Sequence, residues 1–130
     1  MEHFVIEGGK PLSGSIRVQG AKNAALPIFA ATVLAKGIHV IHDVPNLTDV
    51  RAMCRILEAL GAKIQSVGTT YHIDTTHIDN YHIPVELMNK MRSSIFLMGS
   101  LLGRSGKVSV SRPGGCAIGV RPIDIHLFGL

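Results

Sequence analysis

A single cysteine lies in a loop rich in glycine and proline between Ser111 and Asp124. Arg112 and Arg121 flank Cys116 in this loop, and a helix is predicted to begin directly after it. Guanidinium groups and a helix N-terminus both stabilise a thiolate, which is the reactive form of cysteine. The alternative is a flexible loop with an incidental thiol, but a structural cysteine usually belongs to an apolar run, and this one does not. The pattern therefore predicts a functional Cys116.

A second candidate, the pair Lys22-Asn23, lies on a predicted turn between a strand and a helix. Free backbone N–H groups and the helix dipole favour anions at such a turn. Lysine adds a mobile point charge that suits phosphate or carboxylate, although a solvated lysine before a helix is the alternative. Arg92 repeats this arrangement at the start of a later helix, with an exposed arginine as its alternative. Both positions predict contacts to an anionic ligand.

The third candidate is the start of the last predicted helix, Arg121-Pro122-Ile123-Asp124. It offers both a guanidinium and a carboxylate to a sugar nucleotide. The alternative for Asp124 is an ordinary acid in the first turn of a helix, where a negative charge complements the dipole.

Composition restricts the class of protein. The 130 residues suffice for one modest domain with a core, and 46% hydrophobic with 17% charged residues is the globular range. The net charge of +4 comes without a basic run or interleaved aromatics, so nucleic acid is not expected as a partner. No secretory signal and no membrane span are expected either. Two cysteines make no disulfide framework, which favours a reduced, cytoplasmic setting.

Three histidines recur every five residues, at His72, His77 and His82, a spacing that raises the question of a metal. No cysteine or carboxylate pattern with zinc-ligand spacing accompanies them. They are predicted to be solvated residues of strands and loops, and neither a metal nor a cofactor is expected.

Short runs of β-favouring residues alternate with helical periodicity along the chain. The predicted strands, two of them in a hairpin, are Phe4–Ile6, Ile16–Val18, Ile38–Ile41, Lys63–Val67, Tyr71–Asp74 and Lys107–Val110. A turn is expected over Asp43–Asn46 and a loop from Pro84 to Asn89.

Three helices are predicted between these strands, and a fourth follows the last of them near Asp124. The first covers Ala24–Ala35, with its start set between Asn23 and Leu26 so that Pro27 falls in the first turn. The second has Thr48 as N-cap and places Cys54 on its apolar stripe as a packed core thiol. Glycines end the helices, namely Gly37, Gly61 and, for the third helix from Met91 to Leu102, Gly103.

The chain contains an internal repeat. Pro27–Ala35 aligns with Ser94–Leu102, and in each copy a glycine, a strand, a turn and a new helix beginning with Asp49 or Asp124 follow. The repeated unit is βαβαββ-like, which predicts an α/β architecture assembled from copies. The second copy ends at Leu130 inside its final apolar helix, so the chain is expected to be a piece of a longer protein.

Four stretches together resemble the UDP-N-acetylglucosamine enolpyruvyl transferase family: Gly20–Pro27, Leu57–Lys63, Met91–Ser94 and Pro113–Asp124. The resemblance covers essentially the whole chain. It implies a truncated form of the inside-out α/β barrel fold, in which two domains of repeated βαβαββ units surround the active site. Residues 1–21 would then belong to the other domain, and residues 22–130 to an incomplete domain that carries the cysteine loop.

The resemblance also implies a reaction, in which an enolpyruvyl group passes from phosphoenolpyruvate to the sugar 3-hydroxyl and phosphate is released. This would be the first committed step of peptidoglycan synthesis, on which cell-wall biogenesis, cell shape and cell division depend. Cys116 would act as proton donor, form a phosphoenolpyruvate adduct and react with fosfomycin. Lys22, as a catalytic residue, and Asn23 would contact phosphoenolpyruvate. The UDP-sugar contacts would be Arg92, Arg121, Pro122, Ile123, Asp124 and Ile125.

Two other classes of function remain as alternatives for this chain. One is the related shikimate-pathway enolpyruvyl transferase, which shares the repeat and the lysine turn. The other is a non-catalytic chain that only binds ligand, because the family supplies an aspartate base and a further arginine from later sequence. The chain alone is expected to be inactive, and to self-associate through its first two strands and its last helix.

Overall fold

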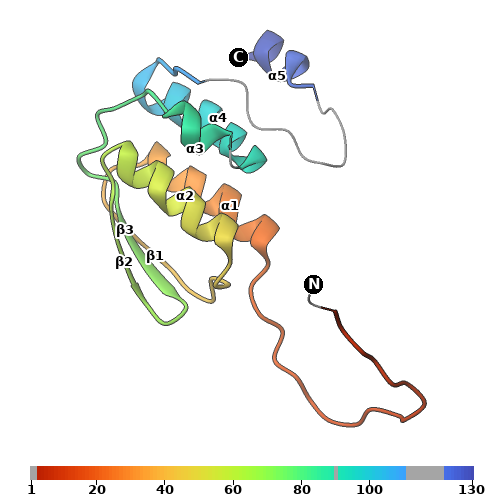
Figure 1. The fold of residues 1–130 in the computed structure, drawn as a ribbon. Coiled ribbons are helices and arrows are strands. Elements are labelled where there is room, and N and C mark those ends of the chain that lie inside the picture. Colours follow the sequence, from red (N-terminus) through yellow and green to blue (C-terminus); the bar gives the residue numbers. More distant parts are fainter. Residues whose placement is uncertain (1–2, 90, 111–121) are drawn as a thin grey trace.

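Three helices lie side by side, and a three-stranded sheet packs against two of them in the computed structural model of the chain (Figure 1). The structure describes residues 3–89, 91–110 and 122–130, except for the side chain of Arg92. The helices are α1 (Lys22–Ala31), α2 (Thr48–Ala59) and α4 (Phe96–Ser105). Their apolar side chains form one core together with the inner face of the sheet. The fold is α/β, as predicted.

The sheet contains β1 (Ile38–Ile41), β2 (Lys63–Val67) and β3 (Thr70–Asp74) in the order β1-β3-β2. Both outer strands pair antiparallel with β3, so β1 and β2 run parallel to each other and α2 connects them. Tyr71 and Ile73 point into the core, whereas the alternate His72 is exposed. The predictions of a strand at Ile38–Ile41 and of the hairpin are confirmed.

Helix α1 begins at Lys22, earlier than predicted, and Pro27 is therefore its sixth residue. Proline has no N–H to donate to the carbonyl of Asn23 and costs helix stability in such a position. Burial offsets this cost, because the same helix places Leu26 and Phe29 in the core. The expectation that Pro27 lies in the first turn was wrong. The helix then tightens into a 3-10 turn, η1 (Thr32–Leu34).

Helix α2 buries the predicted apolar stripe, including Val50, Met53 and Leu57. Its N-cap is Leu47, not Thr48 as predicted, and no side chain caps this end. Thr48 is the first helical residue instead, and its hydroxyl accepts a 3.4 Å hydrogen bond from Arg51. The helix ends before Gly61, which has a φ of +107° and so provides the predicted stop.

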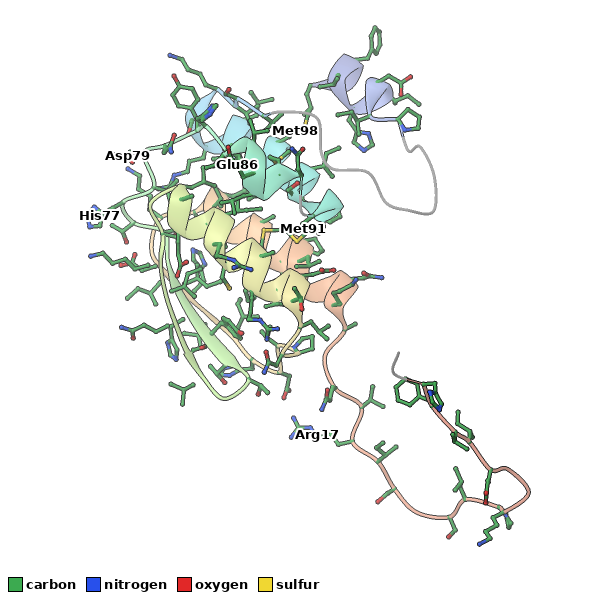
Figure 2. All side chains as sticks on the ribbon, in the orientation of Figure 1. Arg17, His77, Asp79, Glu86, Met91 and Met98 are labelled. Carbon is green, nitrogen blue, oxygen red and sulfur yellow. The ribbon has the colours of Figure 1, made fainter. Side chains whose placement is uncertain are left out.

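The predicted loop after Pro84 contains a short helix, α3 (Val85–Met88), which buries Met88 against the core. The next predicted helix begins as a 3-10 turn, η2 (Arg92–Ile95), and continues as α4. Met91, directly before η2, is buried between α4 and the α1–α2 pair (Figure 2).

Helix α4 does not end at Gly103 as predicted. It continues to Ser105, because the left-handed residue that ends it is Gly106, with a φ of +64° and its N–H donating to Leu102. Gly103 lies inside the helix, where an added Cβ would meet Leu34 at 3.0 Å.

The predicted strand Lys107–Val110 is reduced to one parallel bridge between Ser109 and His82. The two side chains also bond, with His82 Nδ1 lying 3.0 Å from Ser109 Oγ. A strand over the whole of Lys107–Val110 would need an equally long neighbouring strand to pair with. Among the described residues, this segment pairs only at the bridge to His82.

Residues 3–21 extend away from the helix layer (Figure 1), and Arg17 marks this arm in Figure 2. The strands predicted at Phe4–Ile6 and Ile16–Val18 are absent from this described segment, which has no ladder. A strand needs a neighbour for its N–H and C=O groups, and the described residues offer none here; Phe4 is 97% and Val18 88% exposed. At the other end, the predicted last helix is present as α5 (Asp124–Gly129).

Candidate functional site

Three helices begin at the same end of the layer. The first residue of α1 bonds to the second residue of α2, since Lys22 Nζ lies 2.8 Å from Asp49 Oδ2. At the opposite end, Arg104 of α4 donates to the carbonyl of Val33 after α1. Because η2 also contacts α1, the starts of α1, α2 and η2–α4 face the same way (Figure 1). Parallel helix starts present free N–H groups and positive dipole ends, which attract anions.

Lys22 is thus placed where the sequence predicts an anion, but with a partner that sequence reasoning missed. Asp49 lies in the first turn of α2, and the two side chains are 45% and 39% exposed. The repeat, which places an aspartate at the start of both following helices, is the one signal that pointed to this residue. The pair therefore combines a cation with its own counter-ion at the helix starts.

A close backbone contact fixes the direction from which the chain reaches Lys22. A Cβ added at Gly20 would lie 2.0 Å from the carbonyl oxygen of Asp43, so only glycine fits there. Asp43 itself has a φ of +55°, a left-handed conformation in the predicted turn. The glycine of the Gly20–Pro27 stretch is thus needed for packing before the helix.

Two further predicted residues lie at this end of the layer. Asn23 is exposed in the first turn of α1, next to Lys22. Arg92 is the first residue of η2, so its backbone is at the same end, while its side chain lies outside what the structure describes. The backbone therefore brings Lys22, Asn23, Asp49 and Arg92 to one region.

Of the remaining predicted site residues, those that the structure describes lie away from this region. Cys116 and Arg121 lie outside the described residues. Pro122 and Ile123 precede α5, and Asp124 and Ile125 open it. Helix α5 stands apart from the helix layer (Figure 1), with Asp124 and Ile125 exposed.

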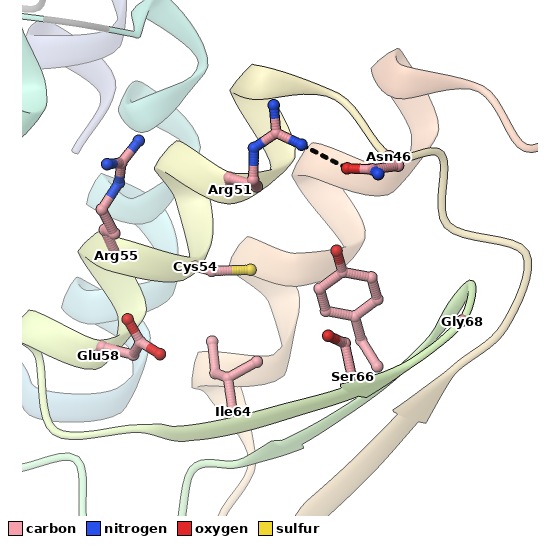
Figure 3. A pocket seen from close by; sticks show the side chains of 9 residues that line it. Asn46, Arg51, Cys54, Arg55, Glu58, Ile64, Ser66 and Gly68 are labelled. Carbon is pink, nitrogen blue, oxygen red and sulfur yellow. Dashed lines mark hydrogen bonds between the residues drawn. The ribbon is translucent and has the colours of Figure 1, made fainter.

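Cys54, expected to be a packed core thiol, is only half-buried. It packs against the core on one side and lines an open hollow of about 620 Å³ on the other. Figure 3 shows the sulfur pointing from α2 toward Ser66 and the hairpin, with Arg51 and Arg55 above it. Desolvation, followed by the charge of Glu58, raises the pKa of Cys54 to about 11. A thiol with so high a pKa is a weak nucleophile at neutral pH.

Residues 6–130 match the family of EPSP synthase (3-phosphoshikimate 1-carboxyvinyltransferase), which is nearly the whole chain. The chain belongs to this family. Among solved structures, the enolpyruvyl transferase NikO from Streptomyces tendae is similar over 76% of this chain and 23% of its own, with a TM-score of 0.66 and 28% identity. Membership therefore agrees with the α/β fold of the described residues.

Curated relatives are much more similar in sequence than this solved structure. A UDP-N-acetylglucosamine 1-carboxyvinyltransferase from Geotalea uraniireducens is 50% identical over all 130 residues. A UDP-N-acetylglucosamine 1-carboxyvinyltransferase 2 from Caldanaerobacter subterraneus is 52% identical over the same length. The chain spans 31% of the length of each of these relatives. No helix within the described ranges is long and apolar enough to cross a membrane.

Proposed function

We propose that this chain supplies part of the active site of an enzyme that makes enolpyruvyl-UDP-N-acetylglucosamine. The enzyme would transfer the enolpyruvyl group of phosphoenolpyruvate to the 3-hydroxyl of UDP-N-acetylglucosamine and release phosphate. The observation that carries this proposal is the identity of about half of all residues, over the whole chain, with relatives that bear this activity in their names. The product would enter peptidoglycan synthesis in the cytoplasm.

The helix starts support an anionic substrate. Phosphoenolpyruvate carries a carboxylate and a phosphate, and the ammonium of Lys22 lies where α1 and α2 both begin. Fixed positive charge at such a site stabilises negative charge that develops during a reaction. We assign Lys22 and Asn23 to phosphoenolpyruvate, with Lys22 also acting in catalysis.

The reaction would proceed by addition and elimination. The sugar 3-hydroxyl attacks C2 of phosphoenolpyruvate and loses its proton, while Cys116 as general acid delivers a proton to C3. The resulting tetrahedral intermediate then loses phosphate from C2 and a proton from C3, which restores the enol double bond on the sugar. We assign UDP-sugar contacts to Arg92, Arg121 and the following residues Pro122, Ile123, Asp124 and Ile125.

A chimera tests the proposal directly. It joins this chain to the remaining part of the Geotalea uraniireducens relative, in place of the 31% that the chain matches. We expect phosphate release that requires both substrates, and we expect Cys116→Ala and Lys22→Ala each to abolish most of it. The unmodified relative is the positive control, and a thermal melt shows whether each chimera folds.

The 130-residue chain on its own is expected to show no such release. Transition-state stabilisation needs groups on both sides of a cleft, and the family's further aspartate and arginine are outside this sequence. A folded chimera without activity would contradict the proposal and favour a chain that only binds ligand. Activity with shikimate 3-phosphate instead of the UDP-sugar would favour the shikimate-pathway reaction.

A further inference from the structure

We infer that Asp49 is a positioning residue that holds the ammonium of Lys22 at the shared helix starts, in the direction from which an anionic substrate approaches. The inference rests on the proposed function. It adds a residue that acts on the substrate through Lys22 and does not itself contact the reacting atoms.

The geometry favours a positioning role. A lysine side chain is a long flexible stem that carries a point charge, so an exposed lysine samples many positions. Here Nζ lies 2.8 Å from Asp49 Oδ2, and the two residues come from the first turns of two helices that pack against each other. The carboxylate is thus anchored on one rigid element and fixes the ammonium of another.

A second ion pair provides a contrast within the described part of the chain. Arg17 and Asp43 are also 2.8 Å apart, but their side chains are 82% and 61% exposed and Arg17 belongs to the extended arm. An exposed pair of this kind contributes little to stability. The Lys22–Asp49 pair is less exposed and connects two packed helices, which makes it suited to fixing a charge.

Asp49 would influence the substrate in two opposite ways. Its carboxylate repels an anionic substrate, so its removal should not weaken binding. It also orients Lys22, and misplacement of a catalytic group by about 1 Å can cost a hundredfold in rate. Loss of the carboxylate should therefore lower kcat without raising KM for phosphoenolpyruvate. A purely structural role, in which Asp49 complements the dipole of α2, would lower thermal stability and leave kcat of the folded protein unchanged.

The test uses Asp49→Asn in the chimera described above. We expect kcat to fall about tenfold or more, with KM for phosphoenolpyruvate unchanged or lower. Asp49→Glu, which keeps the charge, should recover part of kcat. The matched control is Asp79→Asn, an exposed aspartate located far from the helix starts (Figure 2), which should change neither constant.

The outcomes separate this inference from the proposed function. A folded unmodified chimera that does not turn over both substrates contradicts the proposed function. An active chimera in which Asp49→Asn keeps kcat within about twofold, or raises KM in proportion to the loss, overturns the inference alone. If Asp49→Asn does not fold, Asp49→Ser keeps a residue favoured near helix starts and must show the same loss of kcat.

Discussion

Arg104 Nη1, near the end of α4, donates a 2.9 Å hydrogen bond to the carbonyl of Val33, 71 residues earlier in the chain. The other terminal nitrogen donates to the carbonyls of Thr75, at 2.8 Å, and Ile78, at 3.2 Å. One side chain therefore binds the ends of α1, the sheet and α4 together. Val33 and Thr75 are fully buried, so their carbonyls need partners; Arg104 donates to both, and the Thr75 carbonyl also accepts from the N–H of Ile78.

Replacement of this arginine is expected to destabilise the fold. Arg104→Met keeps much of the apolar stem but removes the donor to the buried carbonyl of Val33 and one donor to that of Thr75, which should lower the free energy of unfolding by about 2 kcal/mol. Urea denaturation followed by circular dichroism measures the change. Arg55→Met, at an exposed position on α2, is the control and should shift stability by less than about 0.5 kcal/mol. Equal effects of the two substitutions would contradict the role given to Arg104.

Gly99, inside α4, and Gly106, which ends it, should respond oppositely to alanine. A Cβ at Gly99 meets nothing within 4 Å, so Gly99→Ala should stabilise the protein by about 0.5–1 kcal/mol through helix propensity. Gly106 has a left-handed φ of +64°, so Gly106→Ala should destabilise it by about 1 kcal/mol. Thermal melts of the two variants compare them directly, and a rise in Tm for Gly106→Ala would show that the helix does not end as described.

The close contact at Gly20 predicts a local effect on the candidate site. Gly20→Ala must displace the backbone of Asp43, which lies 2.0 Å from the added Cβ, and should thereby shift the start of α1 and Lys22. In the chimera we expect a loss of kcat of about tenfold or more. Gly8→Ala, where a Cβ meets nothing and φ is not positive, is the matched control and should be silent. Unchanged amide chemical shifts at Lys22 in Gly20→Ala would refute the expected displacement.

The two cysteines should differ in reactivity. The pKa of Cys54 is raised from 9.0 to about 11, which leaves about a hundredfold less thiolate at neutral pH than an ordinary thiol has. Iodoacetamide at pH 7 should therefore label Cys116 before Cys54, as mass spectrometry would show. In Cys116→Ser, labelling of Cys54 should rise about tenfold per pH unit until about pH 11. Preferential labelling of Cys54 at pH 7 would contradict both assignments.

The same shift gives a pH dependence of stability. The folded state holds the Cys54 proton more tightly than the unfolded state, whose pKa is near 9.0. This contribution is complete below pH 9 and disappears as the pH rises through about 11, because the unfolded chain then releases the proton first. Cys54→Ala should show a smaller loss of stability over this interval.

Self-association of the chain is expected at both ends. Residues 3–21 expose Phe4, Ile6 and Val18 on a segment that forms no ladder with the rest of the described chain, and α5 exposes Ile125 and Phe128. Such segments favour pairing with another chain. Light scattering should therefore show a mass that rises with concentration, and a version limited to residues 20–110 should show less of this. A monomer whose end segments are protected from hydrogen exchange would exclude the expectation.

Local signals predicted the parts of the fold that depend on neighbouring residues. Short runs of β-favouring residues predicted β1 and the hairpin, and helical periodicity predicted the apolar stripe of α2. The secondary-structure predictions were wrong where contacts with residues distant in the sequence determine the conformation. Phe4–Ile6 has strand composition but no strand beside it, and Pro27 is tolerated inside α1 because that helix buries Leu26 and Phe29.

In the candidate site, too, the local feature was predicted from the sequence and the long-range contact was not. Lys22 was predicted from its turn, since a lysine before a helix is a local pattern. The salt bridge to Asp49 could not be predicted, because it joins residues 27 positions apart and depends on the packing of α1 on α2. The three carbonyls that Arg104 binds are likewise distant in sequence and carry no signature of their own.

The shared direction of α1, α2 and α4 has a consequence for how fast the chain can fold. Two parallel helices cannot form a local helical hairpin, since the chain must return along their whole length before the second begins. Here β1 makes one return, and the segment after β3 that contains α3 makes the other, because the hairpin ends beside its own start. The contact of α1 with α4 thus closes a loop of about seventy residues, as Arg104 and Val33 show. High contact order of this kind slows folding relative to an antiparallel bundle of equal size, so this helical layer should assemble late, after the hairpin.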